Sequence, residues 1–383
     1  MGTRAPRLKP EVILHSDAAR VNPFPAPTEH LTEGRVSNKM REKVQEMTTI
    51  APNEVHVAFA SNANGILPLK VAMWSVLESA APETVCNIYV LSDGIPGDMQ
   101  EQVRAMAGKA GGRHRITFIA VEDIIPENLK GASRLPRTSW ARIFLPKLLP
   151  DVHRILYLDI DTLTCTDLRQ LMEMDMKGAA IGAVIEYASH AGSDFNERLD
   201  IPQSCPGYFN AGVLLMDLDT FRREDFIPML LDFAERYKDV LTGIDQDTLN
   251  GVLWSRTIHL HPRWNWHDGL TRRILKNKLS APIWQGNSPL HSVEAALAPA
   301  ILHFQGPHKP WHYNHRPERK RYEECMRRAG LEGAFPLPGF NVKDAIKRIV
   351  YIPIYMLTRH RIARLARRLH ARVGDACGTA ARP

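Results

Sequence analysis

Two carboxylates at the end of an apolar run are the sharpest chemical feature of this sequence. The run Arg154–Leu158 is predicted to be a β-strand, and Asp159 and Asp161 follow it with only Ile160 between them. On an extended chain, residues i and i+2 face the same side, so both carboxylates would meet one hard cation. The same pair also suits a structural turn, in which one Asp caps the following segment and the other is solvated. The pair alone therefore leaves both interpretations open.

Two classes of enzyme place such a D-x-D pair after a strand. Phosphatases of the haloacid dehalogenase type use D-x-D-x-T, in which the first Asp attacks phosphorus beside Mg²⁺. Here Thr162 directly follows Asp161, so the match to that pattern is offset by one residue. Nucleotide-sugar glycosyltransferases use the two carboxylates to hold Mn²⁺ or Mg²⁺ against the diphosphate of the donor. A non-catalytic protein that binds sugar nucleotides or glycans is a third alternative.

Four further segments bear on this choice. They are Phe59–Asn64, Leu156–Asp161, Tyr208–Val213 with Asp245–Asp247 after it, and His303–Trp311. In this order, and at about this spacing, the sequence resembles glycosyltransferase family 8 over residues 54–315. This is a retaining family of GT-A fold that includes bacterial lipopolysaccharide α-galactosyl- and α-glucosyltransferases and glycogenin. The resemblance implies transfer of a hexose from UDP-galactose or UDP-glucose to a glycan or glycolipid acceptor, in lipopolysaccharide or cell-surface polysaccharide synthesis.

The resemblance also implies which residues hold a metal ion and the donor's phosphates. His303 would be the third metal ligand beside Asp159 and Asp161, and two carboxylates with one imidazole suit Mn²⁺ better than Mg²⁺, the second candidate. Gly306 would let the backbone approach the diphosphate, and Lys309 would neutralise its charge.

A second group of residues would contact the donor and its sugar. The resemblance matches Arg142 to an arginine that holds the sugar and diphosphate, and it assigns further donor contacts to Ala60, Asn62, Asn64, Ile160, Asn210 and Ala211. Asp245 and Gln246 are the predicted catalytic residues: Asp245 would bind sugar hydroxyls, and Gln246 would lie beside the anomeric carbon, opposite the leaving group. An amide is a poor nucleophile, so we expect same-face attack by the acceptor hydroxyl rather than the paired-carboxylate route of retaining hydrolases. The segment Asp245–Asp247 also suits the first turn of a helix.

The end of the first strand departs from the family pattern. Many members carry two acidic residues where this chain has Asn62 and Ala63. The usual Asp accepts the uracil N–H, and the Asn62 carbonyl would do so without a charge. Gly65 replaces a common aromatic residue, so we expect weaker stacking on the base.

Strands and helices alternate through the region that carries these residues. Strands are predicted at Val55–Ala60, Cys86–Leu91, Ile116–Val121, Arg154–Leu158, Ala179–Ile185 and Gly212–Met216, and helices at Leu67–Ser79, Trp140–Leu149, Pro228–Tyr237 and from Gln246. This alternation predicts an α/β fold with a Rossmann-like, mostly parallel sheet flanked by helices, and functional groups at the carboxyl ends of the strands. We predict a GT-A catalytic domain over residues 51–325. An N-terminal extension over residues 1–50, with a short helix at Ser37–Met47, and a linker and tail over residues 326–383 would flank it.

Composition and charge exclude several classes of protein. With 383 residues, 44% of them hydrophobic and 24% charged, the chain is typical of a folded, soluble protein. Of the net charge of +7, residues 341–383 supply +8 from ten basic and two acidic side chains, which leaves −1 for residues 1–340. A body without excess basic charge argues against nucleic-acid binding. Five cysteines without a C-x-x-C pair, and the lack of an apolar leader or long apolar span, predict a cytoplasmic location.

The basic tail combines apolar and charged side chains in a helical pattern. Ile362, Leu365, Leu369 and Val373 recur at 3-4-4 spacing, which predicts a basic amphipathic helix over Arg359–Val373. Much of the remaining surface would be occupied by Arg361, Arg364, Arg367, Arg368 and Arg372. Before it, Ile349–Leu357 is an uncharged apolar run interrupted by Pro353. The predicted role is peripheral attachment to an anionic membrane surface, at the inner face of the cytoplasmic membrane. A helix packed on the body with solvated arginines is the alternative.

Overall fold

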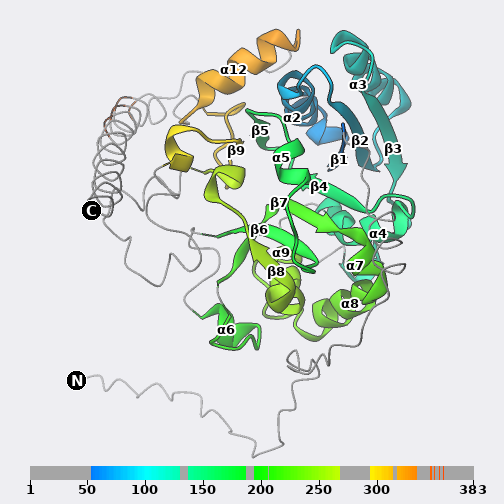
Figure 1. The fold of residues 1–383 in the computed structure, drawn as a ribbon, viewed down its shortest axis with the longest axis vertical. Coiled ribbons are helices and arrows are strands. Elements are labelled where there is room, and N and C mark those ends of the chain that lie inside the picture. The colour runs from blue at the N-terminus through cyan, green and yellow to red at the C-terminus, as the bar shows by residue number, and fades with distance from the viewer. Residues whose placement is uncertain are drawn as a thin grey trace, which may run out of the picture. The chain divides into compact units, whose positions relative to one another are not determined.

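One mixed β-sheet forms the centre of the structure (Figure 1), a computed structural model. It describes residues 53–129, 137–186, 194–205, 207–267, 294–313 and 317–333, together with Ile346, Ile349, Pro353 and Leu357. The predicted helices at Ser37–Met47 and Arg359–Val373 lie outside the described residues. In the part described, seven strands pair in the order β3-β2-β1-β4-β7-β6-β8.

The sheet is mostly parallel, with one reversed strand. Its members are β1 (Glu54–Asn62), β2 (Val85–Asp93), β3 (Arg115–Ala120), β4 (Arg154–Leu158), β6 (Ile181–Ile185), β7 (Phe209–Asp217) and β8 (Thr257–His259). Strand β1 runs parallel to β2 and β4, whereas β7 is antiparallel to both β4 and β6. Leu158 pairs with Val213, so the end of β4 lies beside the middle of β7. The reversal brings residues from the first half of β7 to the edge where Asp159 follows β4.

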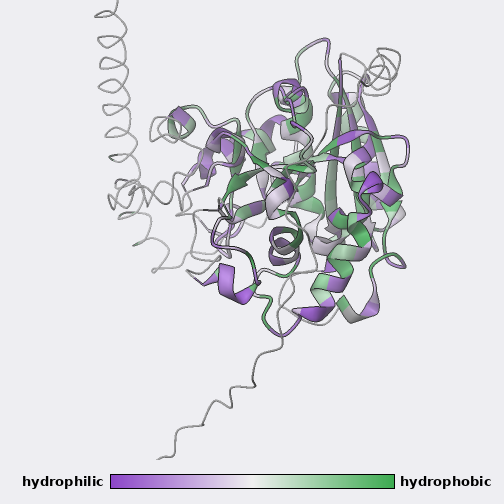
Figure 2. Cartoon of the chain, turned by 60° about the horizontal axis from the view of Figure 1, so that its bottom comes forward, coloured by the Kyte–Doolittle hydropathy of each residue, from purple (hydrophilic) through white to green (hydrophobic). Residues whose placement is uncertain are grey.

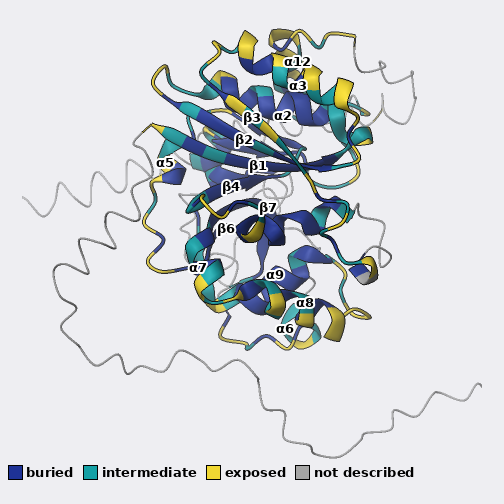
Figure 3. Cartoon of the chain, turned by 90° about the vertical axis from the view of Figure 1, so that its right-hand side faces the viewer, coloured by how far each residue is buried: buried dark blue, intermediate teal, exposed yellow. Residues whose placement is uncertain are grey.

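Helices cover both faces of this sheet (Figure 3). The described helices are α2 (Ile66–Ser79), α3 (Gly97–Lys109), α4 (Leu145–Leu148), α5 (Arg169–Met172), α6 (Phe195–Arg198), α7 (Leu218–Arg223), α8 (Phe226–Arg236), α9 (Asp245–Leu253) and α12 (Arg319–Arg328). Short 3₁₀ turns are η1 (Ala63–Gly65), η2 (Glu127–Leu129), η3 (Arg137–Phe144), η5 (Trp254–Arg256) and η6 (Pro262–Asn265). Helices α2, α3 and α12 pack on one face, and α7, α8 and α9 pack on the other.

Alternation along the strands explains this three-layer arrangement. In β4, Leu156 and Leu158 enter the core beneath α2, while Ile155 and Tyr157 enter the core on the α8 and α9 side. Successive side chains of a strand face opposite sides, so a strand that is apolar throughout requires cover on both. Figure 2 shows this apolar interior, with the hydrophilic residues on the outer turns of the helices.

A small second sheet brings His303, which is distant in sequence from Asp159 and Asp161, close to those two residues. Strand β5 (Thr162–Thr164) pairs antiparallel with β9 (Ile301–His303), and Thr162 stands opposite His303 in the register. The backbone N–H of Phe304 also donates to the carbonyl of Asp161, at 2.9 Å. These backbone bonds fix His303 beside the turn that carries Asp159 and Asp161.

Several described elements differ from the sequence predictions. Those that were not predicted include β5, β8, β9, α5, α6 and α7. Helix α3 was not predicted, because it buries only Val103, Met106 and Ala107 and so shows little apolar periodicity. The helix predicted at Trp140–Leu149 is instead η3 followed by the single turn α4. Pro146 lies in the first turn of α4, where it lacks the N–H that would continue a longer helix back to Arg142. Helix α12, which was not predicted, runs from Arg319 to Arg328 and so crosses residue 325. The end of the catalytic domain at residue 325 stays a prediction.

Candidate active site

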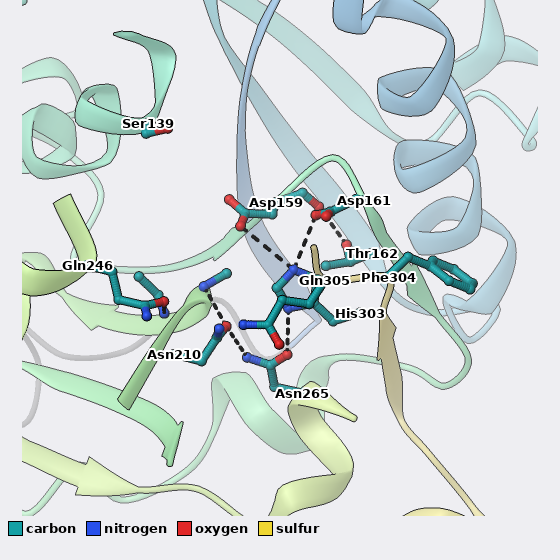
Figure 4. Close-up of polar contacts among 12 residues, drawn as sticks. Ser139, Asp159, Asp161, Thr162, Asn210, Gln246, Asn265, His303, Phe304 and Gln305 are labelled. Carbon is teal, nitrogen blue, oxygen red and sulfur yellow. Dashed lines mark hydrogen bonds and ion pairs between the residues drawn. The ribbon is translucent and has the colours of Figure 1, made fainter. Parts of the chain in front are cut away.

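Asp159, Asp161 and His303 converge at the carboxyl end of β4 (Figure 4). One ligand atom from each lies within 4.8 Å of the other two. His303 Nε2 is 3.2 Å from Asp161 Oδ1 and 3.9 Å from Asp159 Oδ2. The side chain of Asp159 is 29% exposed and that of His303 is 3% exposed, so the cluster faces solvent mainly through Asp159. The convergence expected from the sequence resemblance is therefore present in the structure.

The backbone holds both carboxylates in a tight turn between β4 and β5. The N–H of Asp159 donates to the carbonyl of Gly212 at 2.8 Å, which continues the ladder to β7 by one residue. The hydroxyl of Thr162 donates to the carbonyl of Asp159 at 2.8 Å. Thr162 thus closes the turn by a hydrogen bond to the backbone of Asp159. This contact does not direct the Thr162 hydroxyl towards a substrate phosphate.

Opposite charges keep the cluster ionised despite its burial. Burial alone would raise the pKa of Asp161, but the Lys309 ammonium and His303 beside it hold that pKa well below its usual range. Burial alone would lower the pKa of His303, and the two carboxylates outweigh it and raise that pKa. Asp161 is therefore an anion under ordinary conditions, as a cation ligand must be.

The donor set and the free space fit a divalent cation. Metal–ligand bonds of about 2.0–2.3 Å place the ligand atoms of one ion roughly 3–4.5 Å apart, which is the spacing of this cluster. A Cβ at Gly212 would lie 2.3 Å from His303 Cε1 and 2.7 Å from Asp159 Oδ2, so only glycine leaves both ligands their places. Two carboxylates and one imidazole form a mixed oxygen and nitrogen set of the kind that Mn²⁺ accepts.

Arg142 lies behind the cluster and links its parts. Its Nη2 donates to Asp159 Oδ1 at 3.0 Å, its Nη1 donates to the carbonyl of Ala211, and its Nε lies 3.1 Å from Asp245 Oδ2. The residue is 4% exposed and its guanidinium lies over the Tyr157 ring, 4.1 Å from the ring centroid. These contacts with the protein occupy most of the N–H donors of Arg142. Arg142 therefore supports two carboxylates, those of Asp159 and Asp245. Its contact with a donor stays a prediction.

Lys309 and Gly306 lie on the loop that follows β9. The Lys309 ammonium forms an ion pair with Asp161 Oδ2 and donates to the carbonyl of Phe304 at 3.0 Å. Gly306 has φ +84° and nothing within 4 Å of a built Cβ. Glycine is favoured there by its left-handed backbone, which turns the loop back towards Asp161, and not by lack of space.

Asp245 and Gln246 open helix α9, on the other side of Arg142. Burial raises the pKa of Asp245 to about 6, with Arg142 opposing that rise. The Gln246 carboxamide is held at both ends: its Oε1 accepts the N–H of Ala211 at 2.8 Å, and its Nε2 donates to the Tyr208 hydroxyl at 3.3 Å. An amide oxygen that already accepts a hydrogen bond is a still weaker nucleophile. The expectation that this segment begins a helix is confirmed.

Asp247, two residues further along, is enclosed by protein donors. Its carboxylate accepts from Arg198 Nη1 at 2.7 Å, the Tyr208 hydroxyl at 2.5 Å, and the backbone N–H groups of Thr242 and Gly243 at 2.6 and 2.8 Å. The side chain is 0% exposed. We call these five residues the Asp247 clamp. It fixes the start of α9 and the Tyr208 hydroxyl on which Gln246 rests.

The end of β1 presents Asn62 differently from the sequence expectation. Its Oδ1 accepts the backbone N–H groups of Asn64 and Gly65, at 3.1 and 3.2 Å, and so caps η1. A carbonyl oxygen has two lone pairs, so Asn62 would meet a base mainly through its Nδ2 donor and not through the carbonyl. Ala60 is 7% exposed. Asn64 is exposed and Ile160 partly exposed on the same edge.

Several residues at the site were not predicted as functional from the sequence. Gly212 was only part of the Tyr208–Val213 segment, although a glycine inside an apolar strand is itself a signal of close approach. Gln305 was likewise only part of the His303–Trp311 segment. Glu186 and Asn265 gave no signal, because each reaches the site from a different part of the chain.

The fold and the site together define a glycosyltransferase of GT-A type. The chain belongs to glycosyltransferase family 8, because the family model described as "Glycosyl transferase family 8" matches residues 56–315. The predicted family, fold and enzyme class are thus confirmed. Membership decides against the haloacid dehalogenase alternative that the D-x-D pair left open.

Individual relatives agree with this assignment. General stress protein A of Bacillus subtilis is 28% identical over 279 residues, which are 71% of this chain and 93% of that protein. Lipopolysaccharide 1,2-glucosyltransferase of Escherichia coli is 25% identical over 259 residues, 67% of this chain and 73% of that protein. The solved galactosyltransferase LgtC, in complex with donor and acceptor sugar analogues, matches with a TM-score of 0.61 and 28% identity. That match covers 76% of this chain and 100% of LgtC.

Proposed function

We propose that this protein is a Mn²⁺-dependent, retaining hexosyltransferase that moves galactose or glucose from a UDP-sugar to a glycan or glycolipid acceptor. The observation that carries the proposal is the convergence of Asp159, Asp161 and His303 on one point at the carboxyl end of β4. Relatives named as a lipopolysaccharide 1,2-glucosyltransferase and a lipopolysaccharide 1,3-galactosyltransferase support the hexose and the acceptor class. A role in lipopolysaccharide or cell-surface polysaccharide synthesis follows from the same likeness.

The residues divide the work as follows. Asp159, Asp161 and His303 hold the ion, which when bound supplies Lewis-acid stabilisation of the departing diphosphate. Lys309 neutralises a phosphate oxygen on the same side. We assign the binding of sugar hydroxyls to Asp245, which faces Arg142, and to Asn210, beside Ala211.

We assign the bond changes to a same-face substitution. The acceptor hydroxyl oxygen bonds to the anomeric carbon while the bond from that carbon to the diphosphate oxygen breaks. The hydroxyl proton passes to the departing phosphate oxygen. Gln246, whose oxygen accepts the Ala211 N–H, contributes a fixed dipole beside the anomeric carbon and forms no covalent bond.

A donor screen tests the proposal. Purified protein with Mn²⁺ is incubated with UDP-galactose, UDP-glucose and other nucleotide hexoses, and release of the nucleoside diphosphate is measured with and without a lactose-type acceptor. We expect turnover of at least one UDP-hexose, abolished by chelator, and a product with the donor's α configuration. No turnover of any UDP-hexose, or an inverted product, would contradict the proposal.

We further propose that the tail attaches the enzyme to an anionic membrane surface from the cytoplasmic side. Ile346, Ile349, Pro353 and Leu357 are helical, and the three large side chains are 57%, 72% and 65% exposed. Their 3-4-4 spacing puts them on one helical face, within the segment that carries a net charge of +8. An apolar face beside clustered basic residues favours an anionic interface. Among the described residues, no helix is long and apolar enough to cross a membrane.

Co-sedimentation with lipid vesicles tests the tail. The full chain and a variant lacking residues 341–383 are compared on vesicles with and without phosphatidylglycerol. The deletion is expected to abolish binding to anionic vesicles while leaving transfer to a soluble acceptor intact. Unchanged vesicle binding by the shortened chain would refute the assignment.

A further inference from the structure

A chain of buried polar side chains runs away from the cluster behind His303 (Figure 4). His303 Nδ1 lies 2.9 Å from Asn265 Oδ1, and Asn265 Nδ2 lies 2.7 Å from Asn210 Oδ1. Asn210 Nδ2 in turn lies 2.7 Å from Glu186 Oε2, which also accepts from Gln305 Nε2 at 2.5 Å. Asn265 is 0% exposed, and the side chain of Glu186 is also 0% exposed. Such a network has to be satisfied internally, because water does not reach it.

The direction of every hydrogen bond in this chain is determined. The backbone N–H of Gly212 can only donate, and it donates to Asn210 at 2.9 Å, so the atom that it meets is Oδ1. Asn210 therefore turns Nδ2 towards Glu186, whose carboxylate can only accept. The atom of Asn265 that meets Asn210 Oδ1 must then be its Nδ2 donor. This orientation leaves Asn265 Oδ1, an acceptor, facing His303.

The consequence at His303 is a fixed position for one proton. Because Asn265 Oδ1 can only accept, Nδ1 of His303 carries a hydrogen in both the neutral and the charged ring. In the neutral ring, Nε2 then carries the lone pair, and Nε2 is the atom that faces Asp161 and Asp159. A histidine that binds a metal through one nitrogen commonly donates the other N–H to an oxygen that orients the ring.

The backbone fixes Asn265 as firmly as the side chains do. Asn265 is the last residue of η6, and the next residue, Trp266, brackets β9 with two backbone bonds. Its N–H donates to Ile301 at 2.9 Å, and its carbonyl accepts from His303 at 2.8 Å. The backbones of Asn265 and His303 are therefore held in a fixed register, and the side-chain bonds to Asn210 and His303 hold the amide in place.

We propose that Asn265 is a positioning residue that holds His303 with Nδ1 protonated and Nε2 directed at Asp159 and Asp161, ready to bind a divalent cation. Glu186 sets the polarity of the chain through Asn210, and Gln305 steadies Glu186. The proposal rests on the metal site of the proposed function. It adds a requirement that residues outside the ligand set determine how well the ion is held.

Mn²⁺ binding to two Asn265 variants tests this role without donor or acceptor. Free Mn²⁺ is measured by electron paramagnetic resonance during titration of the wild-type chain, Asn265→Leu and Asn265→Asp. Leucine matches the size of asparagine but offers His303 no acceptor, so we expect the dissociation constant to rise by about 10- to 100-fold. A carboxylate still accepts from Nδ1 but offers Asn210 Oδ1 no donor, so Asn265→Asp is expected to bind Mn²⁺ more weakly than the wild type and more tightly than Asn265→Leu.

The order of the two variants distinguishes positioning from packing. If Asn265 only filled space, the buried charge of Asn265→Asp would be the more damaging change, and leucine would be tolerated. Equal or tighter Mn²⁺ binding by Asn265→Leu than by Asn265→Asp overturns the proposal. Thermal unfolding curves check that each variant is folded at the temperature of the titration.

A matched control uses another buried asparagine far from the cluster. Asn87 in β2 is 6% exposed and bonds to Glu54 and Arg115. Asn87→Leu removes a buried amide of the same kind, and its Mn²⁺ dissociation constant is expected to match the wild type. A loss equal to that of Asn265→Leu overturns the proposal, because it would mean that any buried amide has this effect. Since no sugar enters the measurement, a failed donor screen would leave this result standing by itself.

Discussion

The Asp159–Asp161–His303 cluster and the Asp247 clamp are built from the same kinds of residue but are completed differently. In the clamp, four protein donors surround one carboxylate that is 0% exposed. In the cluster, two carboxylates and an imidazole face one another at 3.2 and 3.9 Å, and Asp159 keeps 29% of its side chain exposed. A buried carboxylate whose lone pairs are filled by the protein stabilises the fold, whereas a partly exposed group of two carboxylates and one imidazole can bind a cation from solution.

The pKa values of two carboxylates in one helical turn show the same contrast. The donors of the clamp outweigh burial and lower the pKa of Asp247. Asp245, two residues earlier, has its pKa raised to about 6 by burial, because Arg142 faces it without a well-aligned hydrogen bond to Oδ2. Ile244, which precedes them with φ +44°, adds a strained backbone for a branched residue. Strain of this kind persists only where the surroundings enforce it.

Breaking the clamp is expected to have the largest effect, and the effect is on stability. Asp247→Ala removes the carboxylate that faces the mostly buried charge of Arg198, and breaking such a buried pair typically costs about 3–5 kcal/mol of unfolding free energy. Guanidinium denaturation measures it. The exposed pair of Asp232 and Arg236 provides the control, since Asp232→Ala should cost less than about 1 kcal/mol. Equal losses of unfolding free energy in Asp247→Ala and Asp232→Ala would contradict the interpretation that protein donors enclose the Asp247 carboxylate.

The stability given by the clamp also has a predicted pH window. Because the folded state lowers the pKa of Asp247, the unfolded chain binds the proton more tightly, and stability falls as pH falls. The advantage of the wild type over Asp247→Asn should be full above the unfolded pKa of about 3.9 and shrink below it. An advantage that grows on acidification would show that the sign is wrong.

Removing the third ligand from the open cluster should affect activity far more than folding. Changing a residue that only supports a metal ligand typically lowers metal affinity or activity by about 10- to 100-fold. Because His303 is itself a predicted ligand, His303→Ala is expected to lower turnover by about 100-fold or more. Turnover at rising Mn²⁺ measures it, and partial recovery at high Mn²⁺ is expected. An alternative chemistry in which Asp159 forms a phospho-enzyme has no need of His303, so full activity in this variant would favour that alternative.

A smaller change at Gly212 sharpens the same contrast. Gly212→Ala inserts a Cβ that would lie 2.3 Å from His303 Cε1, so the ligands must separate. Changes that misplace a metal ligand typically cost about 10- to 100-fold in metal affinity. We expect Gly212→Ala to weaken Mn²⁺ binding by about the same factor. In Gly108→Ala the new Cβ meets nothing within 4 Å, and Mn²⁺ binding should not change. Wild-type affinity in Gly212→Ala would mean that the cluster tolerates a looser geometry than the structure shows.

The smallest effect is a pH dependence of turnover. The pKa of Asp245 is raised to about 6, so this carboxylate gains its proton as pH falls through that value and ceases to accept sugar hydroxyls. Turnover should decline about tenfold per pH unit below 6, and the decline should be absent in Asp245→Asn. If the variant keeps the same acid limb, another group is responsible.

The sequence predicted the parts of the site that lie close to a strong local pattern. The apolar strand before Asp159 and Asp161 could be recognised by itself, and His303 and Lys309 through the family resemblance. The reversal of β7 could not be predicted, because Gly212–Met216 is apolar on both faces and shows no direction. Asn265 and Glu186 could not be assigned either, since their roles arise from contacts across β6, β7 and η6 that no spacing in the sequence encodes.

Arg142 shows what the sequence could not predict about a residue that it singled out. The resemblance implies a contact with the donor, which stays a prediction, and the structure places the residue between Asp159 and Asp245. Its near-complete burial comes from η3, whose 3₁₀ turn replaces the predicted longer helix and directs the side chain beneath Tyr157 and Ala211. Local helix type therefore decided which groups it contacts.

Turnover of a UDP-hexose by the wild type and by Asp159→Asn with Asp161→Asn, each titrated with Mn²⁺, tests the central claim most directly. Both substitutions keep the shape of the side chains and remove their charge. The account predicts Mn²⁺-dependent release of UDP by the wild type and a loss of about 1,000-fold or more in the double variant, measured at a temperature at which circular dichroism shows both proteins to be folded. Full activity in the double variant, or wild-type turnover that persists in excess chelator, would contradict it.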